Sequence, residues 1–174
     1  SKDLLNPIFS AMIARDLITP VQKFSLGRNR YTKDRGYSFE RKLNENTEGI
    51  LDHDLNYYKP YEEKALIPLM FLNAVVTRDF KKMVIGTQPM SFMMSPGFKD
   101  STSKMVGPDA IDFGALFKKE NPLDLRMLTA LRMNASYPYV LPGVWLPSDP
   151  VVDVMDAGLK DNTGQESSLR FLYS

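Results

Sequence analysis

Two apolar runs in the middle of the chain limit its fold most strongly. The first, ALIPLMFLNAVVT at residues 65–77, is apolar at almost every position, and KKMVIGTQP at residues 81–89 is a second run of the same kind. Strands that are apolar on both faces lie in the middle of a sheet that helices cover on both sides. The polar turn TRDF between the runs predicts that the two strands are neighbours. We therefore expect a layered α/β domain.

Helical patterns and one further strand surround these runs. We expect helices within residues 6–20, 38–46 and twice within 108–140, and a last helix that begins with a capping box of Thr163 and Glu166. The segment VVDVM at residues 151–155 predicts a strand. The remaining polar segments, including residues 51–64, are interpreted as loops. This order of elements is typical of a mixed or parallel α/β sheet.

Composition narrows the class of protein. The 174 residues fit one domain, which we take as residues 1–174, and the net charge of +1 provides no basic surface for nucleic acid. No cysteine is present, which excludes disulfides and thiolate metal sites and leaves the compartment open. No apolar run is long enough to span a bilayer, and no signal peptide is visible. The localisation is therefore unknown, with a cytoplasmic or a membrane-associated place both open.

Both ends of the sequence suggest a longer protein. The chain opens at Ser1 without Met, and it stops at SSLRFLYS, where an apolar helical face has just begun. A helix that ended there would leave this apolar face uncovered. We expect the sequence to be one part of a larger protein, so that half of an active site could lie outside it.

The stretch VVDVMDAGLKDNTG at residues 151–164 carries the strongest functional pattern. Asp156 follows a predicted strand, and Gly158 permits a turn that residues with a Cβ resist. A helix follows, and its positive N-terminal end favours an anionic neighbour. Open α/β sheets bind ligands at the ends of strands that feed helices in this way. The pattern predicts a charged carboxylate directed outward.

Three roles for Asp156 remain open on this pattern. The residue could cap its own turn, as Asp before Gly often does. It could belong to a Ca²⁺ or Mg²⁺ site with Asp153, Asp161 and Asn162, although the spacing matches no EF-hand loop. It could also act as a catalytic base or orient a nucleophile.

A longer block, TALRMNASYPYVLPGVWLPSDPVVDVMDAGLKDNTG, resembles the second signature block of the patatin-like phospholipases. In that family a helix runs into a small-residue and proline stretch, then a strand, then Asp-Gly-Gly or Asp-Gly-Ala, and then an Asn. Here the strand is Val151–Met155, the signature acid is Asp156 and the trailing Asn is Asn162. The paired apolar runs and the segments SKDLLNPIF and YTKDRGYSFERKLNENTEG also look like parts of bacterial members, so the resemblance extends over most of the chain.

The resemblance implies a three-layer α/β/α domain and a hydrolase of lipid esters that uses a Ser-Asp dyad. In such an enzyme a serine in a Gly-x-Ser-x-Gly turn attacks the ester, and the Asp acts on that serine directly. This sequence has no Gly-x-Ser-x-Gly, so the resemblance implies that the serine and a glycine-rich oxyanion loop lie upstream of Ser1. The chain would then be the C-terminal part of the domain, inactive alone, with the missing N-terminal part as its partner and Asp156 as the dyad acid.

One departure from the family pattern concerns the motif Asp156-Ala157-Gly158. The family usually has Gly at the second position, and Ala157 would be strained there only if the backbone needed a positive φ. We expect Ala157 to be harmless. The resemblance implies neither a metal nor an organic cofactor. A non-catalytic lipid-binding or interaction domain on the same fold is the alternative, because fold does not fix chemistry.

Other residues have a functional and a structural interpretation. The single histidine, His53, could assist catalysis, but a lone His in a polar segment is more often exposed. Ser91, Ser95 and Ser136 lack the context of a nucleophile. The basic and aromatic residues Arg28, Arg30, Tyr31, Lys33, Arg35 and Tyr37 could make a peripheral contact with phospholipid head groups, although a solvated face with local ion pairs is favoured. The segment Met90–Met94 could form a lipid flap or simply pack into the core.

Overall fold

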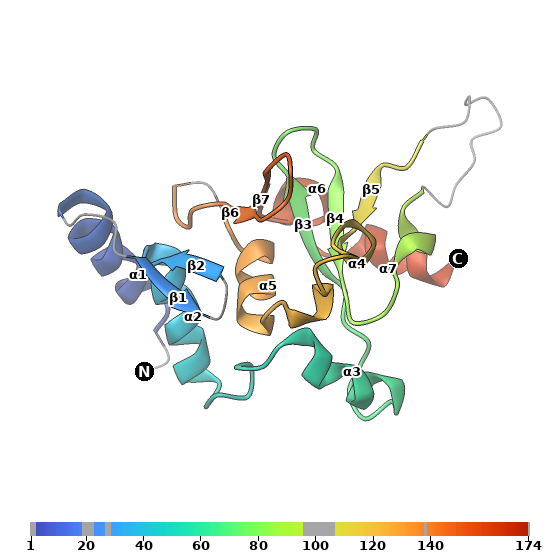
Figure 1. The fold of residues 1–174 in the computed structure, drawn as a ribbon, viewed down its shortest axis with the longest axis horizontal. Coiled ribbons are helices and arrows are strands. Elements are labelled where there is room, and N and C mark those ends of the chain that lie inside the picture. Colours follow the sequence, from blue (N-terminus) through green and yellow to red (C-terminus); the bar gives the residue numbers. More distant parts are fainter. Residues whose placement is uncertain (1–2, 19–22, 27–28, 96–106, 138, 174) are drawn as a thin grey trace.

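The computed structural model describes residues 3–18, 23–26, 29–95, 107–137 and 139–173, and within residues 24–32 it describes only the backbone. A five-stranded mixed sheet forms the centre, in the order β5-β4-β3-β7-β6 (Figure 1). Its strands are β3 (Leu72–Val76), β4 (Lys82–Ile85), β5 (Ala110–Asp112), β6 (Val144–Leu146) and β7 (Val152–Met155). The mixed α/β class predicted from the sequence is confirmed.

The two apolar runs form the central hairpin, as predicted. β3 pairs antiparallel with β4, and Leu72 lies opposite Ile85 at one end of the register. β7 pairs antiparallel with the other side of β3, where Met155 lies opposite Val75. Among the strand pairs in the described residues, β4 with β5 is the parallel one. The last two residues of β7, Val154 and Met155, therefore lie opposite the last two residues of β3, and this register determines where Asp156 lies.

The two faces of the sheet differ in chemistry. Ala74, Val76, Met83 and Ile85 point to one face and pack in the main hydrophobic core with α5 (Met127–Asn134). The alternate residues point to the opposite face, where the side chains of Asn73 and Lys82 reach α7 (Gln165–Leu172). Alternation along a strand produces this division, because successive side chains point to opposite faces. One face of the sheet is therefore apolar, and the other carries buried polar groups.

The helices agree with the sequence in part. α1 (Leu5–Ala11) continues as the π-helix η1 (Met12–Ile18), and α2 (Arg35–Asn46) begins at Asp34, whose carboxylate accepts a hydrogen bond from the Tyr37 amide. The prediction of a loop over residues 51–64 was wrong, because α3 (Leu55–Glu63) forms there. Leu55 and Tyr58 bury one side of α3 in the main core, and this tertiary packing outweighs Pro60 inside the helix.

Short strands and turns account for most other differences. β1 (Lys23–Leu26) and β2 (Asn29–Thr32) pair in a separate two-stranded sheet, and β2 lies in a segment predicted to be a loop. β5 and β6 replace parts of a predicted helix and of a proline-rich connection. Three further short elements are η2 (Ser91–Met93), α4 (Phe113–Leu116) and η3 (Pro122–Asp124). Strands of three residues depend on pairing with distant partners, so local periodicity does not reveal them.

In the part of the chain that the structure describes, no helix combines the length and the apolar character needed to cross a bilayer.

Candidate functional site

Asp156 lies directly after β7 in a segment that is fixed to the C-terminal end of α5. Its amide donates a hydrogen bond to the carbonyl of Ser136 at 3.1 Å, and the amide of Ala157 donates to the carbonyl of Asn134 at 3.1 Å. The second bond satisfies the carbonyl of the last residue of α5, which the helix itself leaves unpaired, and the first bond pairs a carbonyl just beyond the helix. The backbone around Asp156 is therefore held between β3 and α5.

The carboxylate of Asp156 is half-buried and lines an open pocket. One of its oxygens, Oδ1, accepts a hydrogen bond from the amide of Gly158 at 2.5 Å. The other oxygen accepts no hydrogen bond from the described residues, and no cationic side chain among them pairs with Asp156. The turn-capping role is thus present in the structure, and it leaves one oxygen available for a further partner.

The motif residues after Asp156 have distinct structural roles. Ala157 has φ −62°, so its position needs no glycine, and the expectation that Ala157 is unstrained is confirmed. Gly158 begins α6 (Gly158–Asp161) and does not have a positive φ, so the conformational reason predicted for it was wrong. The true reason is space: a Cβ at residue 158 would lie 2.6 Å from Oδ1 of Asp156 and 3.0 Å from Oδ1 of Asn162.

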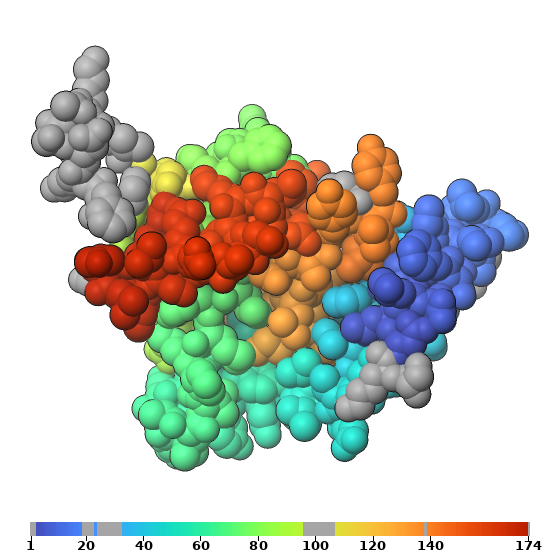
Figure 2. Space-filling view, turned by 180° about the vertical axis from the view of Figure 1, so that it is seen from behind, coloured from blue at the N-terminus to red at the C-terminus, as the bar shows by residue number. Residues whose placement is uncertain are grey.

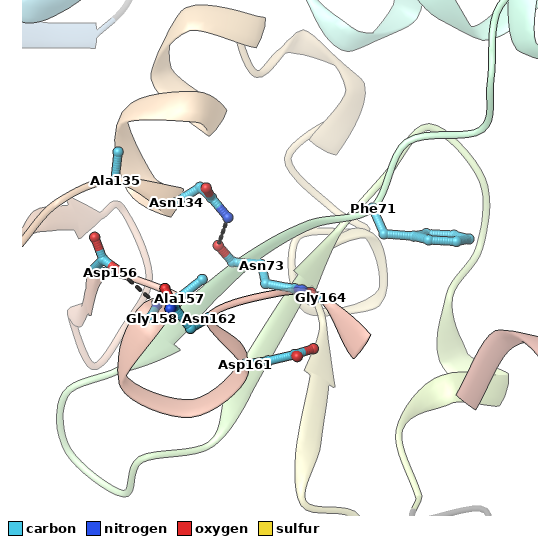
Figure 3. Close-up of a pocket in the computed structure, with 10 residues that line it drawn as sticks. All are labelled: Phe71, Asn73, Asn134, Ala135, Asp156, Ala157, Gly158, Asp161, Asn162 and Gly164. Atoms are coloured by element: carbon cyan, nitrogen blue, oxygen red, sulfur yellow. Dashed lines mark hydrogen bonds between the residues drawn. The ribbon is translucent and has the colours of Figure 1, made fainter. Parts of the chain in front are cut away.

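The pocket in front of Asp156 has a volume of about 290 Å³ and is mainly polar (Figure 3). Asparagine side chains also line the pocket, and Asn134 donates from Nδ2 to the backbone carbonyl of Asn73 at 2.8 Å, which joins α5 to β3. Phe71 lies on the far side, with its ring directed away from Asp156. The residues that line the pocket are Phe71, Asn73, Asn134, Ala135, Asp156, Ala157, Gly158, Asp161, Asn162 and Gly164.

Asp161 belongs to the same loop but is tied to the interior. Its Oδ2 accepts hydrogen bonds from the amide of Ser167 at 3.0 Å and from the hydroxyl of Ser167 at 2.8 Å, and its Oδ1 accepts from the amide of Glu166 at 3.2 Å. Burial raises the pKa of Asp161, but the hydrogen bonds from Ser167 and Glu166 and the charge of Lys82 outweigh it, so the pKa lies below its ordinary value. Asp161 therefore caps α7 from outside the helix.

This arrangement corrects the predicted capping box. The residue at the N-cap of α7 is Gly164, with φ 68°, and no side chain at that position caps the helix. Thr163 precedes the cap and is exposed. Asp161 supplies the acceptor that Thr163 was expected to supply, because the turn 161–164 returns its carboxylate to the first amides of α7.

Lys82 and Ser167 are buried polar residues that the sequence analysis missed. Lys82 is 1% exposed, and its Nζ lies 3.1 Å from Oγ of Ser167 and 3.5 Å from Oδ2 of Asp161. A lysine beside a serine can serve as a base in some hydrolases. Here Nζ also lies 3.5 Å from the carboxylate of Asp161 and 3.6 Å from that of Glu166, and Ser167 is 2% exposed, so the pair is structural. One feature of the sequence could have indicated this buried pair: Lys82 is a lysine at an inward-facing position of the apolar strand β4.

The hypothesis of a Ca²⁺ or Mg²⁺ loop disagrees with the geometry. Asp161 is paired with Lys82, and Asp153 lies within β7 opposite Trp145 on the neighbouring strand. Within the described ranges, no group of three or more acidic or histidine side chains converges on one point. Asp153, Asp156, Asp161 and Asn162 therefore do not form a cation site.

The remaining candidates have structural roles. His53 is exposed, as expected, and stacks on Tyr57 with ring centroids 3.8 Å apart. Ser91 donates its hydroxyl to Asp112 at 2.7 Å, and the fully buried Ser136 donates to the carbonyl of Arg132 at 2.6 Å, while Ser95 is exposed. None of the three hydroxyls bonds to Asp156.

One residue of the basic stretch and three residues of the methionine segment have structural contacts in the described part of the chain. Arg35 pairs with Asp16 at 2.8 Å, as the favoured hypothesis of local ion pairs predicted. Arg28 lies outside the described residues, as do the side chains of Arg30 and Tyr31. Met90, Met93 and Met94 are buried in a second core cluster, so these residues pack and do not form a flap.

Comparison of this chain with known proteins found no relative whose function could be compared with that of this site. No protein-family model, no curated protein and no solved structure matches this chain.

Proposed function

We propose that this chain is the C-terminal part of a three-layer, patatin-like α/β/α domain and that Asp156 is the acid of a Ser-Asp dyad. The parent protein is a serine-dependent acyl hydrolase that acts on phospholipids, lysophospholipids or other lipid esters. The serine and the oxyanion loop come from a part of the protein upstream of this chain. The sequence resemblance of residues 129–164 is the origin of the proposal.

One observation carries the proposal further than the resemblance alone. The carboxylate of Asp156 lines an open pocket, keeps one oxygen without a hydrogen bond from the described residues, and has no cationic partner among them. A base that acts on a serine hydroxyl needs such an unpaired oxygen within hydrogen-bond reach of the nucleophile. A carboxylate held by a lysine, as Asp161 is, would be a poor base for this purpose.

The surroundings of Asp156 suit this role in two further ways. The bond from Gly158 fixes the carboxylate in one orientation, and preorganised groups lose less freedom when the substrate binds. The amides of Asn73, Asn134 and Asn162 supply polar groups around the pocket, which can bind an ester and its alcohol. In this scheme the serine gives its proton to Asp156 and attacks the ester carbon, and the proton passes to the alcohol that leaves the acyl-enzyme. Water then attacks the acyl-enzyme and gives a proton to Asp156, which returns it to the serine as the acid leaves.

A non-catalytic lipid-binding domain is the second candidate. The bond from Gly158 to Asp156 favours it, because this bond alone would explain an Asp at the position as a turn cap. The two candidates differ in one respect: the enzyme needs a nucleophilic serine outside this chain, and the binding domain does not.

The test uses the intact protein that contains this chain. A fluorophosphonate probe should label one serine upstream of Ser1, and Asp156→Asn should lower ester turnover by about 10²–10⁴-fold. Asp153→Asn is the matched control, because Asp153 is also half-exposed but lies within β7, and it should retain turnover. Near-full turnover of Asp156→Asn would refute the dyad assignment, and the absence of any labelled serine would favour the binding domain.

A further inference from the structure

The C-terminal helix α7 directs polar side chains to the interior and apolar side chains to the solvent. Ser167 and Arg170 point inward and are 2% and 6% exposed, whereas the apolar residues Leu169, Phe171 and Leu172 are 45%, 41% and 75% exposed. An ordinary surface helix turns its apolar face to the core and its polar face to water. The reverse arrangement in α7 leaves an apolar surface next to the candidate site.

Specific bonds hold α7 in this orientation. Arg170 makes two bonds to the carboxylate of Asp109, at 2.7 and 2.6 Å, and a third to the carbonyl of Met93 at 3.1 Å. Ser167 is bonded to Asp161, as described above. Two-pronged bonds between arginine and a carboxylate are both strong and directional. A rotation of α7 that buried Phe171 would break these bonds, so the outward position of Phe171 is fixed by the fold.

Three aromatic rings form a row that begins at the pocket, with Phe71 half-buried and Phe171 and Phe92 exposed. Phe71 lines the pocket, its ring centroid lies 5.0 Å from that of Phe171, and the Phe171 centroid lies 6.2 Å from that of Phe92. We call Phe71, Phe171 and Phe92 the aromatic track. Phe92 is 50% exposed at its outer end. In Figure 2 the red C-terminal segment crosses the surface beside the green segment that leads into β3.

We propose that the aromatic track binds the acyl chain of the lipid ester whose carbonyl group lies at Asp156. This inference rests on the proposed function and adds the apolar half of the substrate site. Met155 lies opposite Val75 on β3, so Asp156, the next residue, lies beside Ala74. Phe71 is three residues before Ala74, and at about 3.3 Å per residue the distance from Asp156 along the strand to Phe71 is roughly 10 Å. An amphiphile would match the surface, with its polar end among the amide side chains of the pocket and its apolar chain across the three rings.

This occupant fits better than a protein partner for a physical reason. Phe71 belongs both to the polar pocket and to the track, so polar and apolar surfaces meet at this residue, as one amphiphilic molecule requires. A protein partner that only covered α7 would not need the connection through Phe71. Removal of one exposed aromatic ring from a bound acyl chain should weaken binding about tenfold or more.

The experiment compares Phe171→Ser and Phe92→Ser with the control Ile50→Ser in the intact protein. Ile50 is 69% exposed between α2 and α3, away from the pocket and the track. Two quantities are measured: the affinity for a fluorescent long-chain fatty acid, and kcat/KM for the butyrate and palmitate esters of 4-nitrophenol. Each track variant should lose about tenfold in fatty-acid affinity and in kcat/KM on palmitate, and less than about twofold on butyrate, while Ile50→Ser changes neither.

Each outcome decides for or against the track. Equal losses on both esters, unchanged fatty-acid affinity, or a change of oligomeric mass in light scattering would overturn it, the last because a protein then covers the rings. Fatty-acid binding needs no nucleophile. Loss of that binding in the variants of a protein that hydrolyses no ester would therefore support the track and refute the hydrolase. If the intact protein hydrolyses esters and the variants keep the wild-type preference for chain length, the hydrolase is supported and the track is refuted.

Discussion

Lys82 and Asp161 are 79 residues apart in the chain, and their side chains meet in the interior with Nζ 3.5 Å from Oδ2. The side chains are 1% and 4% exposed. Lys82 begins β4, and Asp161 ends α6, the short helix that follows Asp156. The pair therefore connects the central hairpin to the candidate site and to α7.

The first prediction concerns this buried pair. Lys82→Met should lower the free energy of unfolding by about 3–5 kcal/mol, because it leaves the carboxylate of Asp161 buried without its cation. The neighbouring Lys81 is the control: it pairs with Asp79 at 3.6 Å with both side chains exposed, so Lys81→Met should cost less than about 1 kcal/mol. Urea denaturation measures both, and equal effects of the two substitutions would contradict the role given to Lys82.

The second prediction concerns Gly158. Gly158→Ala places a methyl group 2.6 Å from Oδ1 of Asp156 and must displace the carboxylate. A displacement of about 1 Å at a catalytic group can cost roughly 10²-fold in rate, so turnover of esters by the intact protein should fall by this order. Ala157→Gly is the control and should retain turnover within a few-fold, because residue 157 has an ordinary φ of −62°. Full activity of Gly158→Ala would show that the orientation of Asp156 is not critical.

The third prediction concerns Glu40 on α2. Burial raises the pKa of Glu40 above its ordinary value, although the charge of Arg132 opposes this shift. A carboxyl group with a raised pKa in the folded state binds its proton more tightly there, so its contribution to stability is lost as pH rises through that pKa. Glu40→Gln should therefore stabilise the protein at pH 7, and the gain should disappear in acid.

The control for Glu40 lies on the same helix. The hydrogen bond and charge of Lys42 lower the pKa of the exposed Glu45, so Glu45→Gln should give no such gain at neutral pH. Thermal unfolding at neutral and acidic pH measures both variants. A Glu40→Gln variant that is less stable than the wild type at pH 7 would show that its ion pair with Arg132, at 3.6 Å, outweighs the cost of burial.

The fourth prediction concerns Asp109 and the dependence of the free energy of unfolding on pH in acid. A hydrogen bond from Arg170 lowers the pKa of Asp109, so the folded state binds this proton less tightly than the unfolded chain does. The contribution of Asp109 is then complete above its ordinary pKa of about 4 and is lost as pH falls through the lowered value. Asp109→Asn should reduce stability at neutral pH and flatten the curve below about pH 4. A parallel curve, displaced equally at every pH, would contradict the assignment.

Local pattern was sufficient for the elements that position Asp156. The β-branched run before Asp156 forms β7, and the two apolar runs form the hairpin β3–β4, because strand propensity and apolar burial act in the same direction there. The position of Asp156 at the end of a strand, and the tolerance of Ala at residue 157, also followed from the sequence. These features depend on neighbouring residues in the chain.

Tertiary structure alone decided which polar groups meet. Nothing in the sequence pairs Lys82 with Asp161, assigns the capping of α7 to Asp161, or shows that Gly158 is needed for the space beside Asp156. The inverted orientation of α7 likewise depends on Arg170 reaching Asp109, 61 residues earlier. Such contacts arise from the packing of distant segments, which the local period of apolar residues does not encode. The sequence by itself determined where the carboxylate stands in the chain, and the fold decided what surrounds it.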